Sequence, residues 1–292
     1  MRTIFTHNIG PLAQNYDSFI IDLWGTLHNG IDPFVGALES LKHLQELGKS
    51  VALLSNAPFR SEVVVDVIDN IGIPRELYNH VYSSGEMTWR AIAERTDSWH
   101  ASLGKNVIFI GNDRHRSMLD NPYMVEVEDI GEAEFILCTG PRNSTDTIDN
   151  YMSELELASK IDLPMVCANP DREVLRGNRR EICAGAIAEY YEDQLSGQVV
   201  WHGKPFRPVF EEVLRMLGNP NLSRVLMIGD GIKTDIEGAK RSNIDSFLVC
   251  SGIHASALGI GSGKSLDLES LYRFLDENDQ SPRYAALNMC WG

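Results

Sequence analysis

The sequence lacks the features that would place this chain in a membrane or stabilise it with disulfides. It contains no run of about 18 apolar residues, and its amino terminus has no apolar stretch typical of a signal peptide. Its five cysteines are an odd number without C-x-x-C spacing, which argues against a zinc site or a disulfide framework. We therefore expect a cytoplasmic protein with reduced cysteines, of which Cys138, Cys167 and Cys250 end apolar runs and pack as small core residues.

Positive charge is also scarce. The chain has 26 Lys and Arg against 41 Asp and Glu, a net charge of −15. This balance argues against a nucleic acid or an anionic membrane as a partner, and it means that an anionic ligand needs a local cation. The hydrophobic content of 43% and the charged content of 23% are ordinary globular values.

Short apolar segments alternate with helical ones, which predicts an α/β fold with a doubly wound, Rossmann-like parallel sheet. Residues 37–47, 61–71 and 266–275 read as helices. A separate set of elements follows, with strands at 107–110, 135–137 and 165–167 and helices near 86–95, 145–160 and 184–194. We expect a core of residues 1–83 plus 199–292 and an inserted α/β domain of residues 84–198.

Asp22 ends the apolar run 19–21 and is followed by Gly25, which permits a sharp turn. A carboxylate in that place stands at the carboxyl end of a buried strand, where open α/β sheets bind their ligands. Taken alone, the same Asp could equally cap the next turn.

Three later segments also place polar groups directly after an apolar strand. They carry Ser55 and Asn56 after 51–54, Lys204 after 199–201 with Pro205 predicted at a first helical position, and Asp230 with Asp235 after 225–228. Each segment is weak evidence by itself. Together, a carboxylate, a hydroxyl, a cation and an acidic pair predict a site for a phosphate and a metal ion.

This set of motifs resembles the haloacid dehalogenase (HAD) superfamily, whose members mostly hydrolyse phosphate esters through an aspartyl-phosphate. The phrase 167–171, Cys-Ala-Asn-Pro-Asp, followed by Gly-Lys-Pro at 203–205, resembles subclass IIA. That subclass contains nucleotide, sugar and p-nitrophenyl phosphatases. The resemblance implies that the insertion is a cap selecting a small phosphorylated substrate, and that two copies can pair through their caps.

The resemblance also implies a role for each motif residue. Asp22 is expected as the nucleophile, Lys204 as its charge partner, and Gly25, Thr26, Ser55 and Asn56 as phosphate-binding residues. Mg²⁺ is expected on Asp22, the Trp24 backbone carbonyl and Asp230, with Asp235 supporting it from behind. Hard oxygen ligands of this kind suit Mg²⁺.

Trp24 departs from the family pattern, because the phosphatases carry a second Asp there that protonates the leaving group. An indole N–H has no usable acidity, and general acid catalysis is typically worth about 10²–10⁴-fold. Some dehalogenases have an aromatic residue at this position and use no metal, but they lack the acidic pair kept here as Asp230 and Asp235. A metal-assisted phosphatase is therefore preferred, with a metal-independent dehalogenase or a non-catalytic phosphometabolite-binding protein as alternatives.

Three residues are candidates for the missing acid: His28, His115 and Asp171. An imidazole titrates near neutral pH, although a structural role for His28 is at least as plausible. Acyl, aryl or enol phosphates would need no acid. Among the arginines that follow residue 171, Arg176 and Arg179 are candidates for a clamp on a second anionic group, and a solvated charged face is the alternative.

Overall fold

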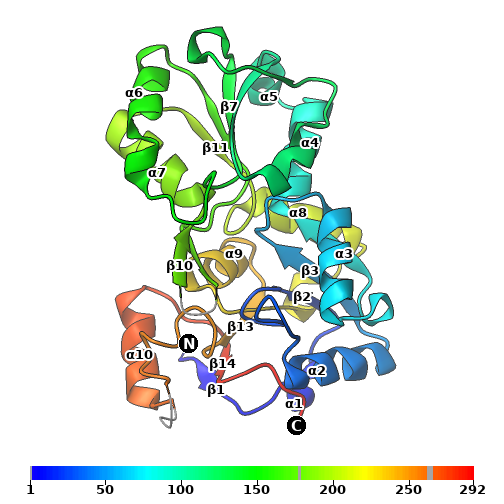
Figure 1. Cartoon of the computed structure of the whole chain (residues 1–292). Coiled ribbons are helices and arrows are strands. Elements are labelled where there is room, and N and C mark those ends of the chain that lie inside the picture. Colours follow the sequence, from blue (N-terminus) through cyan, green and yellow to red (C-terminus); the bar gives the residue numbers. More distant parts are fainter. Residues whose placement is uncertain (1, 177–178, 262–265) are drawn as a thin grey trace. The chain divides into compact units, whose positions relative to one another are not determined.

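The computed structural model describes residues 2–176, 179–261 and 266–292 (Figure 1). The chain divides into two compact units by its internal contacts. Unit 1 comprises Met1–Ser55, Val65–Tyr82 and Lys204–Gly292, and unit 2 comprises Asn56–Val64 and Ser83–Gly203. The insertion predicted at 84–198 thus falls inside unit 2.

Unit 2 also takes in the segment Asn56–Val64, which the sequence-based boundaries assigned to the core. The segment is tied to the start of helix α4 (Ser84–Glu94). Ser83 Oγ donates to the Phe59 carbonyl at 2.5 Å, and the Arg60 guanidinium pairs with Glu86 at 2.6 Å. These contacts join residues more than 20 positions apart, so no local pattern reveals them.

Unit 1 is built on a sheet with the strand order β1-β14-β13-β12-β2-β3-β4. The strands are β1 (Ile4–Phe5), β2 (Ser18–Ile21), β3 (Ser50–Ser55), β4 (His80–Ser83), β12 (Val225–Gly229), β13 (Asp245–Val249) and β14 (Tyr284–Ala286). The helices are α1 (Gly10–Ala13), α2 (Val35–Glu46), α8 (Arg207–Met216), α9 (Glu237–Arg241) and α10 (Leu268–Glu277), with a π-helical turn, η6, at Ile232–Ile236. Helix α3 (Ser61–Ile71) belongs to this unit from Val65 onward.

The order of the unit 1 strands reverses at the β2–β12 pair. The chain proceeds from β2 through α2 to β3 in one direction, and from β12 through α9 to β13 in the other. Strand β12 is parallel to both β2 and β13, and β2 is parallel to β3. Since crossovers between parallel strands are right-handed, α2 and α9 cover opposite faces, and such a reversal is the place where open α/β sheets bind their ligands. The predicted doubly wound α/β fold is confirmed.

Unit 2 has its own sheet in the order β11-β8-β7-β5-β6, and the paired strands are parallel. Its strands are β5 (Asn106–Ile110), β6 (Val125–Glu126), β7 (Phe135–Cys138), β8 (Met165–Cys167) and β11 (Val199–Trp201), and a separate antiparallel hairpin joins β9 (Glu173–Arg176) to β10 (Arg179–Ile182). The α-helices are α4, α5 (Ser98–Ser102), α6 (Met152–Lys160) and α7 (Ala184–Leu195).

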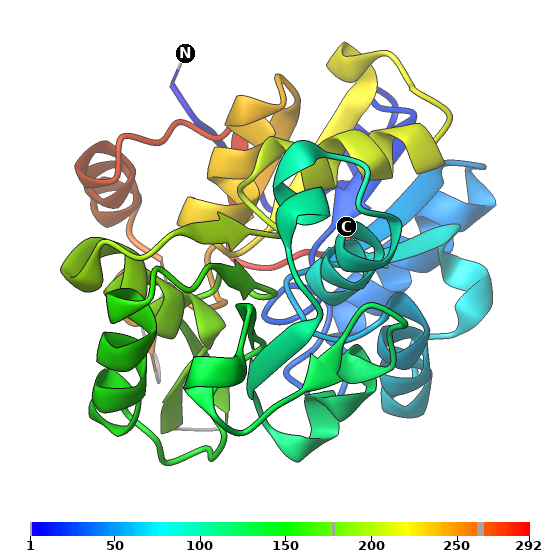
Figure 2. The same ribbon diagram turned by 90° about the horizontal axis from the view of Figure 1, so that it is seen from above.

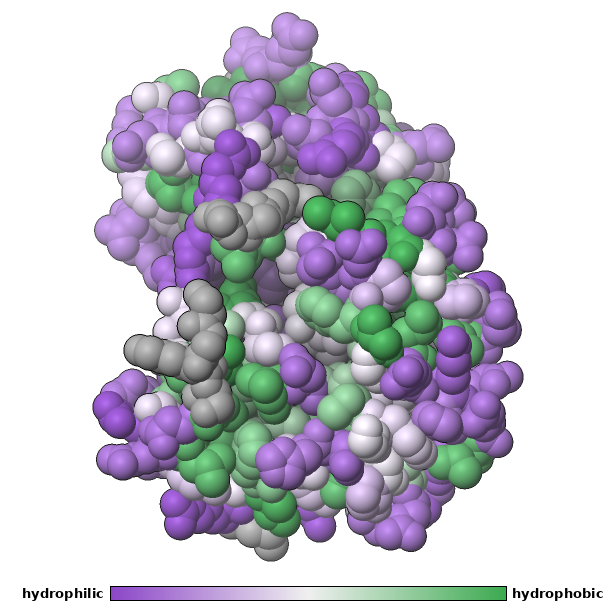
Figure 3. Space-filling model, turned by 60° about the horizontal axis from the view of Figure 1, so that its bottom comes forward, coloured by the Kyte–Doolittle hydropathy of each residue, from purple (hydrophilic) through white to green (hydrophobic). Residues whose placement is uncertain are grey.

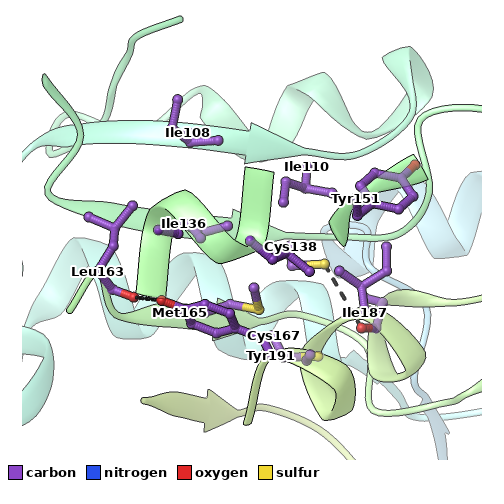
Figure 4. Packing of buried hydrophobic residues seen from close by; sticks show 14 residues of the cluster. Ile108, Ile110, Ile136, Cys138, Tyr151, Leu163, Met165, Cys167, Ile187 and Tyr191 are labelled. Carbon is purple, nitrogen blue, oxygen red and sulfur yellow. Dashed lines mark hydrogen bonds between the residues drawn. The ribbon is translucent and has the colours of Figure 1, made fainter. Parts of the chain in front are cut away.

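Alternate residues of the unit 2 strands point to opposite faces of the sheet. Ile136 and Cys138 pack toward α6 and α7, where Tyr191 and Ile187 complete the cluster in Figure 4. Residues of the other face, among them Leu137, pack toward α4. Figures 1 and 2 accordingly show α6 and α7 on one side of these strands and α4 on the other. Both faces are buried, as parallel sheets require.

Cys138, Cys167 and Cys250 are fully buried, as predicted, and all five cysteines are free thiols.

Two predicted helix starts need correction. The helix predicted from 145 begins only at Met152, because residues 148–150 form a short 3₁₀ turn. Pro205 precedes its helix rather than opening it, since α8 begins at Arg207 and takes the next proline, Pro208, into its first turn.

Hydrophobic surface is distributed in patches. On the face drawn in Figure 3, apolar residues lie in separate groups among hydrophilic side chains. No helix within the described ranges is both long and apolar enough to cross a bilayer.

Candidate active site

The candidate site lies in unit 1, where the two central strands β2 and β12 end side by side. Asp22 directly follows β2, and its backbone N–H donates to the Ile228 carbonyl of β12 at 2.9 Å. Asp230 directly follows β12. Because the strands are parallel neighbours, the two carboxylates emerge at the same edge of the sheet. The sequence predicted this meeting from two apolar runs more than 200 positions apart.

Lys204 connects the acidic residues of this edge. Its ammonium group lies 2.5 Å from Asp22 Oδ1 and 2.7 Å from Asp235 Oδ1, and it donates to the Leu54 carbonyl at 3.2 Å. Only 2% of the lysine is exposed. A buried ammonium group needs such partners, because removing a charge from water costs several kcal/mol unless it is paired.

Three carboxylates compete for that one lysine. Oxygen atoms of Asp22, Asp230 and Asp235 lie within 4.8 Å of one another, and all three residues are buried. Burial, followed by the charges of the other two, raises the pKa of Asp230 well above its usual range. Burial likewise raises the pKa of Asp235 to about 6, with a smaller contribution from the Asp22 charge. If all three ionise, Lys204 compensates one of three negative charges.

A divalent cation fits this excess of buried negative charge. The donor set is made of hard carboxylate oxygens, the ligands of Mg²⁺ and Ca²⁺. Glycines also keep the surroundings of Asp230 clear, because a Cβ at Gly25 or Gly252 would lie 2.1 or 2.0 Å from Asp230 Oδ2. The N–H of Ile253, next to the second glycine, donates to that oxygen at 2.7 Å.

Comparisons with known proteins agree with this geometry. Residues 19–122 match the family model described as haloacid dehalogenase-like hydrolase, and residues 201–263 match one described as HAD-hydrolase-like. A crystal structure of a haloacid dehalogenase-like hydrolase from Brucella suis is 30% identical, with a TM-score of 0.83, over 97% of this chain and 99% of that one. The chain belongs to the haloacid dehalogenase-like hydrolase family.

More distant relatives of this HAD-like hydrolase carry named activities. The 5′-nucleotidase YutF of Bacillus subtilis is 24% identical over 82% of this chain and 89% of its own length. The 4-nitrophenylphosphatase of Schizosaccharomyces pombe is 25% identical over 82% of this chain and 85% of its own length. Both match nearly the full relative, so the similarity extends over the two units.

The loop after Asp22 is closed on itself. The Gly25 N–H donates to the His28 carbonyl at 2.9 Å, and the Thr26 N–H donates to the Leu23 carbonyl at 3.3 Å. Both amide groups are thus engaged within the loop, and the phosphate-binding role of Gly25 and Thr26 stays a prediction. Thr26 is 1% exposed, and its hydroxyl makes no hydrogen bond within the described residues.

Trp24 packs its ring within the same loop. A Cβ at Gly30 would lie 2.2 Å from Cη2 of the indole, so the glycine is required for this contact. The indole also meets the His28 ring edge-on, with the ring centres 5.6 Å apart. At the position where the resemblance implies an acid, the tryptophan thus packs its side chain against Gly30 and His28.

The His28 ring lies buried inside the same loop. It is 3% exposed, and its Nδ1 accepts the Gly30 N–H at 2.9 Å. Burial lowers the pKa of His28 to about 4, so the ring is neutral at physiological pH. A neutral imidazole is a very weak acid, so this state disfavours the acid role of His28, which stays a prediction.

Ser55 closes β3 in unit 1, whereas Asn56 and the remaining candidates belong to unit 2. The Asn56 amide donates to Asp171 Oδ1 at 2.9 Å, an interaction that sequence reasoning missed. The Nδ1 atom of His115 lies 3.0 Å from Thr139 Oγ1, and the His115 ring meets the Phe59 ring edge-on. The roles of these residues toward a substrate stay predictions.

The clamp suggested for Arg176 and Arg179 stays a prediction. Arg179 pairs with Glu181 at 2.7 Å and donates to Ser144 Oγ at 2.8 Å, as expected of a solvated charged face. The side chain of Arg176 lies outside the described part of the chain. One signal for the site was present but overlooked: Gly252 follows the apolar run 247–250, in the pattern that already identified Asp22 and Asp230.

Proposed function

We propose that this HAD-like hydrolase is a Mg²⁺-dependent phosphatase for a small phosphorylated metabolite, with Asp22 as the nucleophile. The observation that carries the proposal is the buried ammonium group of Lys204 between Asp22 and Asp235, inside a cluster of three carboxylates. The named activities of the relatives, a 5′-nucleotidase and a 4-nitrophenylphosphatase, support a phosphate monoester as the substrate class.

The residues of the site divide the work as follows. Asp22 and Asp230 would hold Mg²⁺ with the Trp24 carbonyl, and Asp235 would orient Lys204 and the metal ligands. The ion would supply positive charge against the phosphoryl oxygens, the dominant requirement of this chemistry. Lys204 adds its own charge and holds Asp22 in place. The Ser55 hydroxyl would donate to a phosphoryl oxygen.

The reaction is a double displacement on Asp22. A carboxylate oxygen of Asp22 attacks phosphorus in line, the bond to the leaving oxygen breaks, and an aspartyl-phosphate forms. Water then attacks phosphorus and releases inorganic phosphate, restoring the carboxylate. The inserted α/β domain, which forms most of unit 2, would select the substrate.

Protonation of the leaving group is the step for which this chain lacks the residue that the family resemblance implies. Trp24 offers no proton, and His28 is neutral because burial lowers its pKa to about 4. We therefore infer a preference for aryl or acyl phosphates, whose leaving groups are stable as anions. The His28→Gln variant should lose equal activity on alkyl and aryl phosphates, since the ring only supports the loop.

A dehalogenase remains the alternative that Trp24 favours. Asp230 and Asp235 oppose it, because buried carboxylates around Asp22 would repel each other without a cation. The test is release of phosphate from 4-nitrophenyl phosphate with and without Mg²⁺, beside release of halide from 2-haloacids. Phosphate release that needs Mg²⁺ and vanishes in Asp22→Asn supports the phosphatase; halide release without metal overturns it.

Substrate and assembly need separate measurements. A panel of nucleotide, sugar, aryl and acyl phosphates identifies the preferred ester by kcat/KM. Pairing of two copies through unit 2 is a prediction from the family resemblance, and analytical ultracentrifugation of the full chain decides it.

A further inference from the structure

Asn56 and Asp171 form a partly buried contact at the point where the chain enters unit 2. Asn56 directly follows Ser55, the last residue of β3, and is 3% exposed. Its side-chain amide donates to Asp171 Oδ1 at 2.9 Å, although the two residues are 115 positions apart. Both belong to unit 2.

Asp171 is itself held in a fixed loop. Its backbone N–H donates to Asn169 Oδ1 at 2.9 Å, and its carbonyl accepts the Gly185 N–H at 3.0 Å, near the start of α7. A Cβ at Gly185 would lie 2.5 Å from that carbonyl, so only glycine permits the approach. The carboxylate of Asp171 therefore projects from a backbone that is anchored on a helix of 12 residues.

Asn56 also approaches Gly203, the last residue of unit 2 before the chain returns to unit 1. A Cβ at Gly203, where φ is +116°, would lie 2.6 Å from Asn56 Oδ1. Gly203 directly precedes Lys204. The Ser84 hydroxyl adds a further link, because it donates to the Ala168 carbonyl at 2.6 Å and lies 3.1 Å from that of Ala57. The amide of Asn56 is thus enclosed by backbone whose position several contacts determine.

We propose that Asp171 is a positioning residue that fixes the Asn56 side chain and, through it, the Ser55–Asn56 peptide. This inference rests on the proposed function, in which the Ser55 hydroxyl donates to a phosphoryl oxygen. A displacement of about 1 Å at such a site can cost roughly 10²-fold in rate, so a fixed side chain beside Ser55 matters for binding. Asp171 then acts as a hydrogen-bond acceptor and transfers no proton.

Two substitutions separate positioning from acid catalysis. Asp171→Asn keeps an acceptor oxygen for the Asn56 amide, whereas Asp171→Ala removes it. We expect Asp171→Ala to raise the Kd of inorganic phosphate, measured calorimetrically with Mg²⁺, by about tenfold or more, and Asp171→Asn by less than about threefold. With 4-nitrophenyl phosphate, KM should follow Kd, and the pH profile of kcat should keep its shape in both variants.

The matched control is Asp149→Asn, an exposed carboxylate of the same unit outside this cluster, which should leave Kd and KM unchanged. Equal loss in Asp171→Asn and Asp171→Ala, with a lost limb in the pH profile, would mean that Asp171 is an acid and would overturn the inference. Wild-type Kd and KM in Asp171→Ala would overturn it as well.

A stability cycle tests the contact without any turnover, so it separates this inference from the proposed function. Asn56→Ala, Asp171→Ala and the double variant are melted as full chains. The double variant should lose less in Tm than the sum of the single losses, by about 2–4 °C. Additive losses would overturn the contact, whereas coupling in a protein that hydrolyses no phosphate ester would count against the proposed function alone.

Discussion

The two units have similar architecture but bury very different side chains. Each is built on a sheet of parallel strand pairs with helices packed against it. Within the described residues, the buried Asp, Glu, Lys and Arg are Asp22, Lys204, Asp230 and Asp235, and all lie in unit 1. Unit 2 buries neutral polar groups instead, such as Thr139 and Asn169.

This difference separates the fold from its chemistry. Burying a charge costs several kcal/mol unless partners compensate it, and folding alone gives no reason to bury four together. Unit 2 folds with the same layers and avoids that cost. The concentration of charge at one switch point of unit 1 is therefore evidence for function rather than for stability.

Removal of the nucleophile should have the largest effect. Asp22→Asn keeps the size of the side chain but loses the attacking carboxylate, so kcat for 4-nitrophenyl phosphate should fall by roughly 10⁴-fold or more. The matched change in unit 2, Asp113→Asn at an exposed position, should leave kcat unchanged. Comparable losses in both would erase the distinction between the units.

Lys204→Met should reduce stability as well as activity. The change leaves Asp22 and Asp235 without their shared cation, and breaking a buried pair typically costs about 3–5 kcal/mol in the free energy of unfolding. Chemical denaturation without metal measures the loss, and added Mg²⁺ should recover part of it because it compensates the same carboxylates. Lys160→Met, an exposed lysine of unit 2, should change stability by less than about 0.5 kcal/mol; an equal loss there would show that burial of Lys204 has no special role.

Gly252→Ala should weaken metal binding more than folding. Its Cβ would lie 2.0 Å from Asp230 Oδ2 and would force that carboxylate away from Asp22 and Asp235. We expect the Mg²⁺ concentration for half-maximal activity to rise by about tenfold, which corresponds to about 1.4 kcal/mol. Gly261→Ala, which meets nothing within 4 Å, is the control; an unchanged Mg²⁺ requirement in Gly252→Ala would contradict the metal assignment to Asp230.

His28 should have the smallest effect, visible only in acid. Its folded pKa of about 4 lies below the unfolded value of 6.5, so the unfolded chain binds more protons between these pH values. Its contribution to stability is complete above about pH 6.5 and is lost as the pH falls toward 4, by up to about 3 kcal/mol. His28→Gln should flatten the free energy of unfolding over this window. An unchanged slope in His28→Gln would mean that the imidazole is not buried in its neutral form.

Much of the site was predictable because its signal is local. Asp22 and Asp230 each end an apolar run, and parallel strands bring such ends together whatever their separation in the chain. Lys204 was predicted from the family resemblance and its place after β11. Residues placed by the ends of strands can thus be predicted from the sequence.

The remaining features depend on packing between distant segments. The role of His28 follows from its burial beside Gly30, and nothing in the motif distinguishes that position from an exposed one. The Asn56–Asp171 contact joins residues 115 positions apart. Pro205 and Pro208 are both acceptable near a helix start, so the pattern alone could not decide which of them enters α8.

The most direct test of the account is a crystal structure of the full chain with Mg²⁺ and beryllium trifluoride, which mimics a phosphoryl group on a carboxylate. The account predicts the fluoride complex on an Asp22 oxygen, with Lys204 beside it and the ion bound by Asp22 and Asp230. An ion bound elsewhere, or an Asp22 that carries no fluoride complex while the ion is present, would contradict it.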